Sequence, residues 1–369
     1  MNFETTHTIS ALNDRLFGTG GDADHEMVTL RSDPISGLKA IIAVHSTARG
    51  PAFGGCRYWH YASDTAALHD AMRLSQGMSL KNALADLPFG GGKAVILKGA
   101  EPADRGQFFR AFGRVVESLN GSYITAEDVG TTVADMRQVQ SQTWFVSGVN
   151  GVNADTREQK FGGDPSPMTA LGVFVSIQVA VGKLLGRSTL EDVTVAVQGL
   201  GSVGWTLCEL LWAAGAILTV SDIDAARAER AREKFAARVV PPAEILTQPV
   251  DVLAPCALGG ALNDQTAETV RARIIVGAAN NQLSHADIDA VLHARGIFYA
   301  PDFLVNAGGI ISVAREWLGQ GDEASVTAEV MRIGERLAEL IDRIHGGSTA
   351  PAREAENWAR SKLVAAPRG

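Results

Sequence analysis

The chain has 369 residues, of which 46% are hydrophobic and 20% charged, and its formal net charge at pH 7 is −8. This composition is typical of a globular protein with one large domain or, more often, two of ordinary size. The acidic balance, without a dense basic cluster on any predicted face, argues against nucleic acid as a partner. The opening MNFETTHTIS lacks the basic and apolar regions of a secretory signal.

The most apolar long stretch, Met168 to Gly186, is interrupted by polar side chains such as Gln178 and Lys183. We therefore expect it to be too short and too polar to cross a bilayer, and we expect no membrane partner. The three cysteines are far apart and fit neither a zinc site nor a disulfide framework, so we expect no metal. A reducing cytoplasm is the simplest location for such a chain.

The first half predicts strands and helices around a glycine-rich centre. LKAIIAVH predicts a strand over 38–45, and GPAFGGCRYW predicts a glycine-rich turn. Apolar residues at helical spacing predict a helix over about 63–84. LPFGGGKAVI then places three glycines directly before Lys93 and a strand, KAVIL. A second helix is predicted over 103–119, followed by a short strand, YIT, and the polar loop AEDVGTT.

A polar segment divides the chain near its middle. Residues 147–168 are rich in Gly, Asn, Asp and Pro and predict the connection between two domains. Within it, NADTREQKF at 153–161 has no functional interpretation. Beyond it, strands alternate with helical stretches, which predicts a mainly parallel sheet with helices on both faces. The expected strands cover about 193–198, 216–221, 250–253, 273–276 and 297–300.

The clearest motif follows the strand VTVAVQ. GLGSVG places Gly199, Gly201 and Gly204 in G-x-G-x-x-G spacing, and a helix begins at once with Ser202 and Val203. The first glycine permits a tight turn, the second lets a pyrophosphate approach the backbone, and the third lets the helix pack on the strand. The N–H groups at the start of the helix would bind the phosphates. Because strand, turn, helix and next strand occur in order, the motif predicts a dinucleotide site.

Asp222 ends the next strand, AILTVSD, about 20 residues after the turn. A carboxylate there can accept hydrogen bonds from the adenosine ribose and would repel a 2′-phosphate. We therefore expect NAD rather than NADP, although an ordinary turn residue is the alternative interpretation.

Dinucleotide binding does not name a reaction. Lys81, Lys93 and Asp128 in the first half form a plausible set for an α-amino acid: one lysine holds the carboxylate and the other, crowded and desolvated, acts as a base. The three glycines at 90–92 would then let substrate and cofactor approach the backbone. From spacing alone, solvated surface lysines are an equally good interpretation.

The motifs together resemble one known family, the glutamate/leucine/phenylalanine/valine dehydrogenases, and most closely its leucine branch. The matching stretches include GPAFGGCR, RLSQGMSLKNALADLPFGGGKAVI, YITAEDVGTT, GGDPSPMTALGV, VAVQGLGSVG, GAANNQL and PDFLVNAGGIISV, between about residues 40 and 315. The resemblance implies an N-terminal α/β catalytic domain and a Rossmann-type NAD-binding domain, with the active site in the cleft between them. The first domain would comprise residues 1–150 with the C-terminal helices from about 335–369, and the second residues 151–334.

The resemblance also implies roles for particular residues. Lys81 matches the lysine that binds the substrate carboxylate, Lys93 the catalytic lysine that activates water, and Asp128 the aspartate that moves protons at the amino group. Asn306 matches an asparagine near substrate and nicotinamide, and Asn280 one that holds the nicotinamide. The backbone of Gly54 and Gly55 matches a part of the pocket beside the substrate.

The reaction that this family carries out is reversible oxidative deamination of an amino acid to a 2-oxo acid and ammonia. Glutamate enzymes have a lysine at the position of Phe53 and a serine at that of Val313, so a buried substrate carboxylate would be unpaired here. The implied pocket, with Ala126 and Ile310, is apolar and favours an aliphatic substrate of the leucine, valine or isoleucine type.

Other interpretations stay open. Phe53 stands where leucine is usual and could stack on an aromatic substrate, and a specialised amino acid is possible for the same reason. A non-catalytic NAD-binding protein is a third alternative, although it would be expected to lose Lys93 or Asp128 first. Family members are usually homo-oligomers, so a dimer or an octamer is expected.

Overall fold

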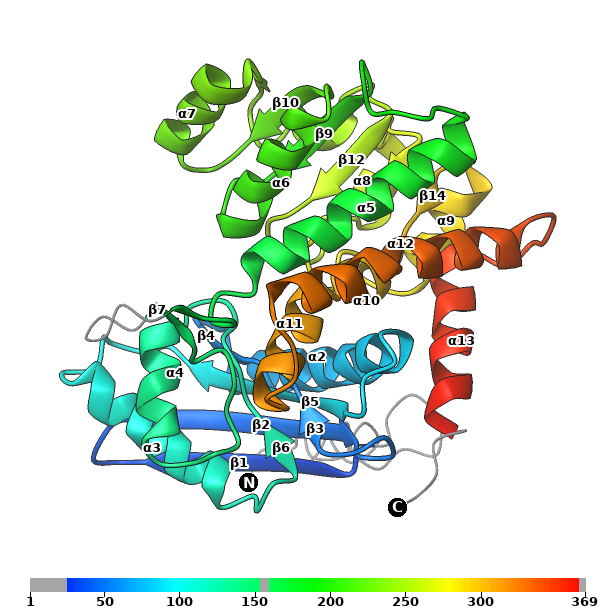
Figure 1. Cartoon of the computed structure of the whole chain (residues 1–369). Coiled ribbons are helices and arrows are strands. Elements are labelled where there is room, and N and C mark those ends of the chain that lie inside the picture. Colours follow the sequence, from blue (N-terminus) through cyan, green and yellow to red (C-terminus); the bar gives the residue numbers. More distant parts are fainter. Residues whose placement is uncertain (1–24, 153–158, 365–369) are drawn as a thin grey trace, which may run out of the picture. The chain divides into compact units, whose positions relative to one another are not determined.

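A computed structural model of the chain describes residues 25–152 and 159–364, which form two compact units (Figure 1). The first unit contains residues 25–82 and 88–149, and the second contains 83–87 and the described residues from 150 onward. Most of the segment NADTREQKF lies outside the described residues. Both units are α/β, as the sequence predicts.

The first unit is built on a mixed sheet. Its strand order is β1-β2-β5-β3-β6, and β4 also pairs with β5. β1, β2 and β5 are antiparallel neighbours, whereas β3 and β4 run parallel to β5, and β6 runs parallel to β3. The strands are β1 (Met27–Asp33), β2 (Leu38–Ser46), β3 (Ala52–Phe53), β4 (Cys56–Trp59), β5 (Gly90–Leu97) and β6 (Tyr123–Ile124).

Helices cover both faces of this sheet, because β2 is apolar on both sides. Its residues Leu38, Ala40, Ile42 and Val44 pack with the phenylalanines of α3 and with α4, whereas Ile41 and Ala43 pack with α2. Successive side chains of a strand point to opposite faces, so one strand serves two cores. The helices are α2 (Asp64–Leu84), α3 (Arg105–Glu117) and α4 (Val133–Gln140) (Figure 1).

Two features of the first unit differ from the sequence-based expectation. β1 was not predicted: its pattern MVTLRSD is partly exposed and polar, as suits the outermost strand of a sheet. The segment GPAFGGCRYW is not simply a turn. It contains β3 and β4, and Gly54 and Gly55 separate the two short strands.

The second unit has the strand order of a Rossmann domain. Its sheet runs β11-β10-β9-β12-β13-β14, and the pairings are parallel. In chain order this is 3-2-1-4-5-6, the order of dinucleotide-binding folds. The strands are β9 (Thr194–Gln198), β10 (Ile217–Ser221), β11 (Arg238–Val239), β12 (Val252–Pro255), β13 (Ile274–Ile275) and β14 (Phe298–Tyr299). Five of the six match predicted strands to within two residues at each end, and β11 was not predicted.

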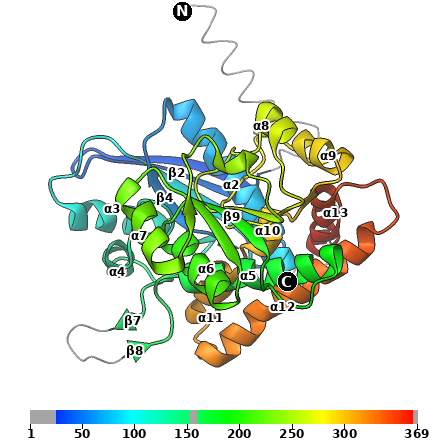
Figure 2. The same cartoon turned by 90° about the horizontal axis from the view of Figure 1, so that it is seen from above.

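The helices of this unit lie on both faces of its sheet. Figure 2 shows α5 and α6 on one side of β9 and α8 with α9 on the other. Ala196 of β9 packs in the core under α8 and α9, with Leu253 and Ile275 from neighbouring strands. The helices are α5 (Ser166–Leu185), α6 (Ser202–Ala213), α7 (Ala225–Phe235), α8 (Asp264–Thr269), α9 (Asp287–Ala294), α10 (Asp302–Val305), α11 (Gly308–Trp317), α12 (Glu323–Ile344) and α13 (Pro351–Val364); a short hairpin, β7 (Gly151–Val152) with β8 (Gln159–Lys160), precedes them.

Among the described helices, α5 alone is long and apolar enough to cross a membrane by length and composition. It contacts α6, α11 and α12 within its unit. The expectation that this stretch is too short and too polar was therefore wrong by that criterion, although the core helix of a soluble protein can pass the same test.

The C-terminal helices group with the second unit. α12 packs along α5, and α13 contacts α9, β14 and α12. The sequence analysis placed the residues from about 335 with the first domain, and its exact boundaries stay a prediction.

Candidate functional site

Lys93 and Asp128 lie together in the first unit. Lys93 is on β5 and only 3% exposed, and its Nζ lies 2.9 Å from Asp128 Oδ2. A turn fixes Asp128: its N–H donates to Thr131 Oγ1 at 3.0 Å, and the Thr131 N–H donates to the Asp128 carbonyl at 3.0 Å. The two residues that the sequence singles out for acid–base chemistry are thus an ion pair.

A second cation, Arg57, contacts the same carboxylate. Its Nε lies 3.2 Å from Asp128 Oδ2, and its side chain is 15% exposed. Burial alone would raise the pKa of Asp128, but Lys93 and Arg57 outweigh burial and hold this pKa well below its usual range. The sequence analysis missed Arg57, which follows Gly55 by two residues in GGCR.

The glycines before Lys93 have a different purpose from the one expected. A Cβ at Gly90 would overlap the carbonyl oxygen of Ser46, and one at Gly91 would overlap the backbone nitrogen of Ser79 in α2. A Cβ at Gly92 would lie 2.6 Å from the ring of Tyr123. The space beside these glycines is therefore filled by the protein itself. They let β5 pack closely on its neighbours, and the expectation of a close substrate approach was wrong.

Lys81 lies in the last turn of α2 and is 8% exposed. The next residue, Asn82, donates from Nδ2 to the carbonyl oxygens of Gly90 at 2.5 Å and Phe53 at 3.3 Å. These bonds tie the end of α2 to the start of β5 and to the end of β3. Lys81 thus stands on a helix end that is fixed to the strand of Lys93.

The residues expected around the substrate side chain are buried in both units. Phe53 is fully buried and its ring packs edge-on against Phe89, with centroids 5.0 Å apart, and Ala126 is 3% exposed. Ile310 and Val313 lie on α11 in the second unit and are 8% and 3% exposed. A common pocket for these residues stays a prediction.

Gly54 and Gly55 lie between β3 and β4, and both are buried. A Cβ at Gly54 would overlap the carbonyl oxygen of Gly92, and one at Gly55 would lie 2.9 Å from Asp128 Cβ. Because Gly55 lacks a side chain, Asp128 can lie against this backbone.

The dinucleotide motif adopts the geometry that its glycines predict. Gly199 has a φ of +89°, and its N–H donates to the Ser221 carbonyl at 2.8 Å. A Cβ at Gly204 would overlap the Gly199 carbonyl oxygen, whereas a Cβ at Gly201 would meet nothing within 4 Å. The middle glycine thus leaves room beside the start of α6, where Ser202 and Val203 form the first turn.

Asp222 lies against this turn. Its Oδ2 accepts from the Leu200 N–H at 2.6 Å and its Oδ1 from the Asp224 N–H at 2.8 Å. Arg227 Nη1 lies 3.5 Å from Asp222 Oδ2, an ion pair that the sequence analysis did not anticipate. A carboxylate has about four acceptor positions, so Asp222 can still accept from a ribose hydroxyl.

A pocket of about 460 Å³ opens beside these groups. The start of α5, the glycine turn, α6 and α7 line it, and its lining includes Ser166, Gly201, Ser202, Trp205, Arg227 and Arg230. The N–H groups at the start of α6 and two arginines thus line the same pocket, a combination suited to binding phosphates.

Asn306 and Asn280 lie side by side in the second unit. Asn306 Nδ2 donates to Asn280 Oδ1 at 2.9 Å and to the Ala278 carbonyl at 3.0 Å. Asn306 is 4% exposed, and its Oδ1 is a buried acceptor that has no partner among the described residues. A buried acceptor of this kind fits a carboxamide N–H, as a nicotinamide would supply. The second unit therefore fits a dinucleotide at both the glycine turn and the asparagine pair.

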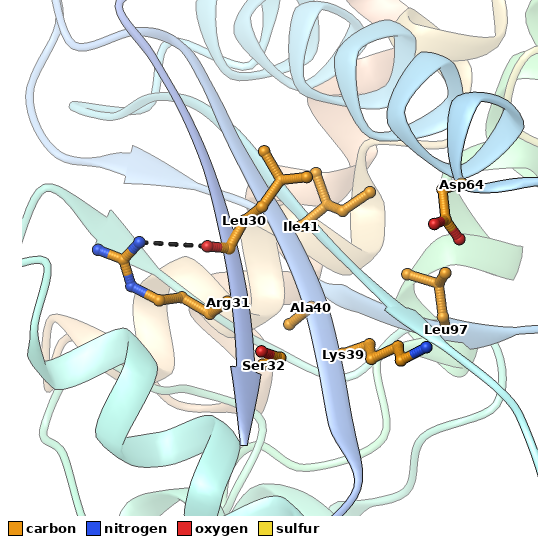
Figure 3. A pocket seen from close by; sticks show the side chains of 8 residues that line it. All are labelled: Leu30, Arg31, Ser32, Lys39, Ala40, Ile41, Asp64 and Leu97. Atoms are coloured by element: carbon orange, nitrogen blue, oxygen red, sulfur yellow. Dashed lines mark hydrogen bonds between the residues drawn. The ribbon is translucent and has the colours of Figure 1, made fainter. Parts of the chain in front are cut away.

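A smaller hollow, of about 210 Å³, lies on the outer strands of the first unit (Figure 3). Leu30 and Arg31 of β1, Lys39 of β2 and Asp64 of α2 are among its lining residues. It includes none of the residues predicted for the site.

Comparison with known proteins identifies the family. A sequence model described as the dimerisation domain of Glu/Leu/Phe/Val dehydrogenases matches residues 25–144, and the glutamate/leucine/phenylalanine/valine dehydrogenase model matches residues 163–366. The chain belongs to this family. It is an amino-acid dehydrogenase with a two-domain α/β fold, as the motifs indicated.

Individual relatives cover most of the chain. Leucine dehydrogenase of Bacillus subtilis is 46% identical over 322 residues, which are 87% of each chain. L-tryptophan dehydrogenase of Nostoc punctiforme is 44% identical over 329 residues, 89% of this chain and 90% of its own. The crystal structure of the Nostoc enzyme aligns over 100% of both chains with a TM-score of 0.75 and 38% identity.

Proposed function

We propose that the protein catalyses the reversible, NAD-dependent oxidative deamination of an apolar L-amino acid to the 2-oxo acid and ammonia. The substrate is of the leucine, valine or isoleucine type. The observation that carries the proposal is the buried ion pair of Lys93 with Asp128, 2.9 Å apart, in a chain of this family. Leucine dehydrogenase is among its relatives at 46% identity.

Three residues of the chain have separate roles in the proposed reaction. Lys81 binds the substrate carboxylate, from a helix end that Asn82 ties to β5. Lys93, once its ammonium has released a proton, acts as the base for the water that adds to the oxidised substrate carbon, and its burial at 3% exposure excludes competing solvent. Asp128 exchanges protons with the amino group. When bound, the nicotinamide supplies the chemistry of hydride acceptance from the substrate Cα.

The low pKa of Asp128 fixes the direction of its first step. Because Lys93 and Arg57 hold this carboxyl ionised, Asp128 begins the deamination as a proton acceptor. The proton that it takes from the substrate ammonium or from the carbinolamine hydroxyl is later available to the departing ammonia.

The cofactor assignment rests on the second unit. The glycine turn and the first residues of α6, Ser202 and Val203, would hold the pyrophosphate, and Asn280 and Asn306 the nicotinamide carboxamide. Asp222 would accept from the adenosine ribose and disfavour a 2′-phosphate. Arg227 offsets part of this repulsion, because it lies 3.5 Å from the same carboxylate.

The substrate class rests on the apolar set of Phe53, Ala126, Ile310 and Val313. Methylene-sized differences in such pockets change discrimination by only about 1–3 kcal/mol, so overlapping specificity for aliphatic amino acids is expected. An aromatic substrate is the second candidate. The aromatic ring of Phe53 and a tryptophan dehydrogenase at 44% identity favour it.

The protein would act as a homo-oligomer, a dimer or an octamer, in the cytoplasm. A match to a dimerisation domain over residues 25–144 supports self-association through the first unit.

A spectrophotometric screen tests the proposal. Purified protein receives NAD or NADP with L-leucine, L-valine, L-isoleucine, L-phenylalanine, L-tryptophan or L-glutamate, and Lys93→Ala serves as the matched inactive variant. We expect NAD-dependent activity on the aliphatic amino acids that Lys93→Ala loses by at least about 10²-fold. Activity on aromatic amino acids alone would move the assignment to the second candidate. A protein that binds NADH but has no activity on any of these substrates would contradict the proposed function.

A further inference from the structure

We infer that Arg57 is a positioning residue of the reaction centre: it holds Asp128 by one oxygen, while Asp70 and Tyr61 hold Arg57. The inference rests on the proposed function, since it concerns the proton transfer of Asp128. It adds three residues of the first unit that neither the motifs nor the glycine turns singled out.

The geometry of Arg57 joins two carboxylates. Its Nε lies 3.2 Å from Asp128 Oδ2, and its Nη1 lies 2.9 Å from Asp70 Oδ2. The Tyr61 hydroxyl donates to the same oxygen of Asp70 at 2.5 Å. The planar guanidinium has donors on different edges, so it can bind one carboxylate with each and be locked in between. A lysine at this position, with a single nitrogen, could not span both.

Both cations contact the same oxygen of Asp128. Lys93 Nζ and Arg57 Nε each lie on Oδ2, at 2.9 Å and 3.2 Å. Among the contacts of the described residues, none involves Oδ1, and the side chain retains 14% exposure. Oδ1 is therefore the oxygen that the amino group of a substrate would meet. Arg57 would set the orientation of this oxygen without touching the substrate.

The charges of the cluster also balance. Two cations, Lys93 and Arg57, lie against two carboxylates. Both cations contact Asp128, and Arg57 also contacts Asp70. Arg57 stays cationic, because Asp128 and Asp70 raise its pKa although burial would lower it. A guanidinium does not release its proton in proteins, so Arg57 cannot relay protons. Its effect is on the position and the charge of Asp128.

Removing Arg57 should disturb both the position and the charge of Asp128. Asp128 would keep Lys93 but lose the contact that fixes its plane, and Asp70 would add an unbalanced negative charge nearby. An opposite charge within about 4–6 Å lowers a carboxyl pKa by roughly 1–3 units, so its loss should raise the pKa of Asp128 by about one unit or more. A misplacement of about 1 Å can reduce turnover by about 10²-fold.

The experiment compares four forms of the full-length protein: wild type, Arg57→Ala, Asp70→Asn and Arg114→Ala. The last removes an arginine of the same unit whose ion pair with Asp33, at 3.6 Å, is exposed. The substrate is the amino acid that wild type turns over best in the screen. The readouts are kcat and KM, turnover with added guanidinium ion, and NADH affinity by fluorescence.

We expect Arg57→Ala to lower kcat by about 10²-fold while KM changes much less. Guanidinium ion should restore part of kcat in Arg57→Ala and have no such effect on wild type. Asp70→Asn should lower kcat by less, because Arg57 keeps its contact with Asp128. Arg114→Ala should match wild type, and NADH affinity should be unchanged in every form.

Several outcomes overturn the inference. One is a kcat of Arg57→Ala equal to that of Arg114→Ala. Another is a lower kcat without rescue by guanidinium ion, since a merely structural loss gives that pattern. If Arg57→Ala does not fold, Asp70→Asn decides, and an unchanged kcat there rejects the role. A wild type without amino-acid dehydrogenase activity would reject the proposed function itself. An active wild type whose Arg57→Ala and Asp70→Asn variants have unchanged activity would reject only the positioning role of Arg57.

Discussion

Asp289 should make the stability of the second unit depend on pH. It lies on α9, is 3% exposed, and its Oδ2 accepts from the N–H groups of Ala352 at 2.8 Å and Arg353 at 3.2 Å, in the first turn of α13. Its Oδ1 is buried and has no hydrogen-bond partner within residues 25–152 and 159–364. Burial raises the pKa of Asp289 from 3.8 to about 6, although the two N–H groups oppose this shift. The folded state therefore binds a proton that the unfolded state has already lost.

The shift gives the size and the sign of the effect. A difference of about two pKa units corresponds to roughly 3 kcal/mol of unfolding free energy. Because the folded pKa is the higher one, this stability is fully present below about pH 4 and is lost as the pH rises through about 6. Asparagine at 289 keeps an acceptor for the α13 N–H groups but carries no charge. The pH-dependent term should therefore disappear in Asp289→Asn.

Urea unfolding of wild type and Asp289→Asn, at intervals between pH 4 and pH 7.5, measures this term. We expect the free energy of unfolding of the variant, relative to wild type, to rise by about 1–3 kcal/mol across this range. Taking the difference cancels the titration of all other groups. A difference that is independent of pH, or one that falls as the pH rises, would refute the reasoning.

Two further predictions concern the dinucleotide turn. Gly204→Ala places a Cβ on the Gly199 carbonyl oxygen, so NADH affinity measured by fluorescence should fall by about tenfold or more while the circular dichroism spectrum is retained; an unchanged affinity would mean that the turn relaxes without cost. Arg227→Ala leaves the charge of Asp222 uncompensated on that side, so kcat/KM for NADP should fall about two- to fivefold more than kcat/KM for NAD. Equal losses for the two cofactors would show that Arg227 has no part in discriminating between them.

Most of the second unit could be predicted from the sequence, because its local signals agree with its topology. Apolar strands alternate with helices, and each glycine of GLGSVG has a separate steric requirement that the structure meets. In the six-stranded sheet of this unit only the short β11 was missed, since two exposed residues in a strand leave no periodic pattern. The first unit was harder. Its β3 and β4 have two and four residues, and they lie in a stretch whose glycines suggest a turn.

The glycines at 90–92 show where sequence reasoning failed and why. A glycine indicates that a Cβ would not fit, but the sequence does not say what occupies the space. Before Lys93 we expected substrate, and the structure has Ser46, Ser79 and Tyr123 there. At Gly201 the motif around it specified a ligand, and the structure leaves that side open, whereas the approach of a pyrophosphate there stays a prediction. A glycine therefore carries functional information only when its neighbours define the occupant.

Arg57 presents the complementary case. Lys93 and Asp128 could be named because each stands in a motif beside a strand end, but their mutual charge balance depends on a residue from β4 and on Asp70 from α2. Those four side chains are spread over 72 positions of sequence, from 57 to 128, so no local pattern joins them. Parallel pairing of β4 with β5 brings Arg57 to the side of Lys93. Because an uncompensated buried carboxylate would take up a proton rather than stay charged, this pairing would allow Asp128 to begin the proposed reaction as a base.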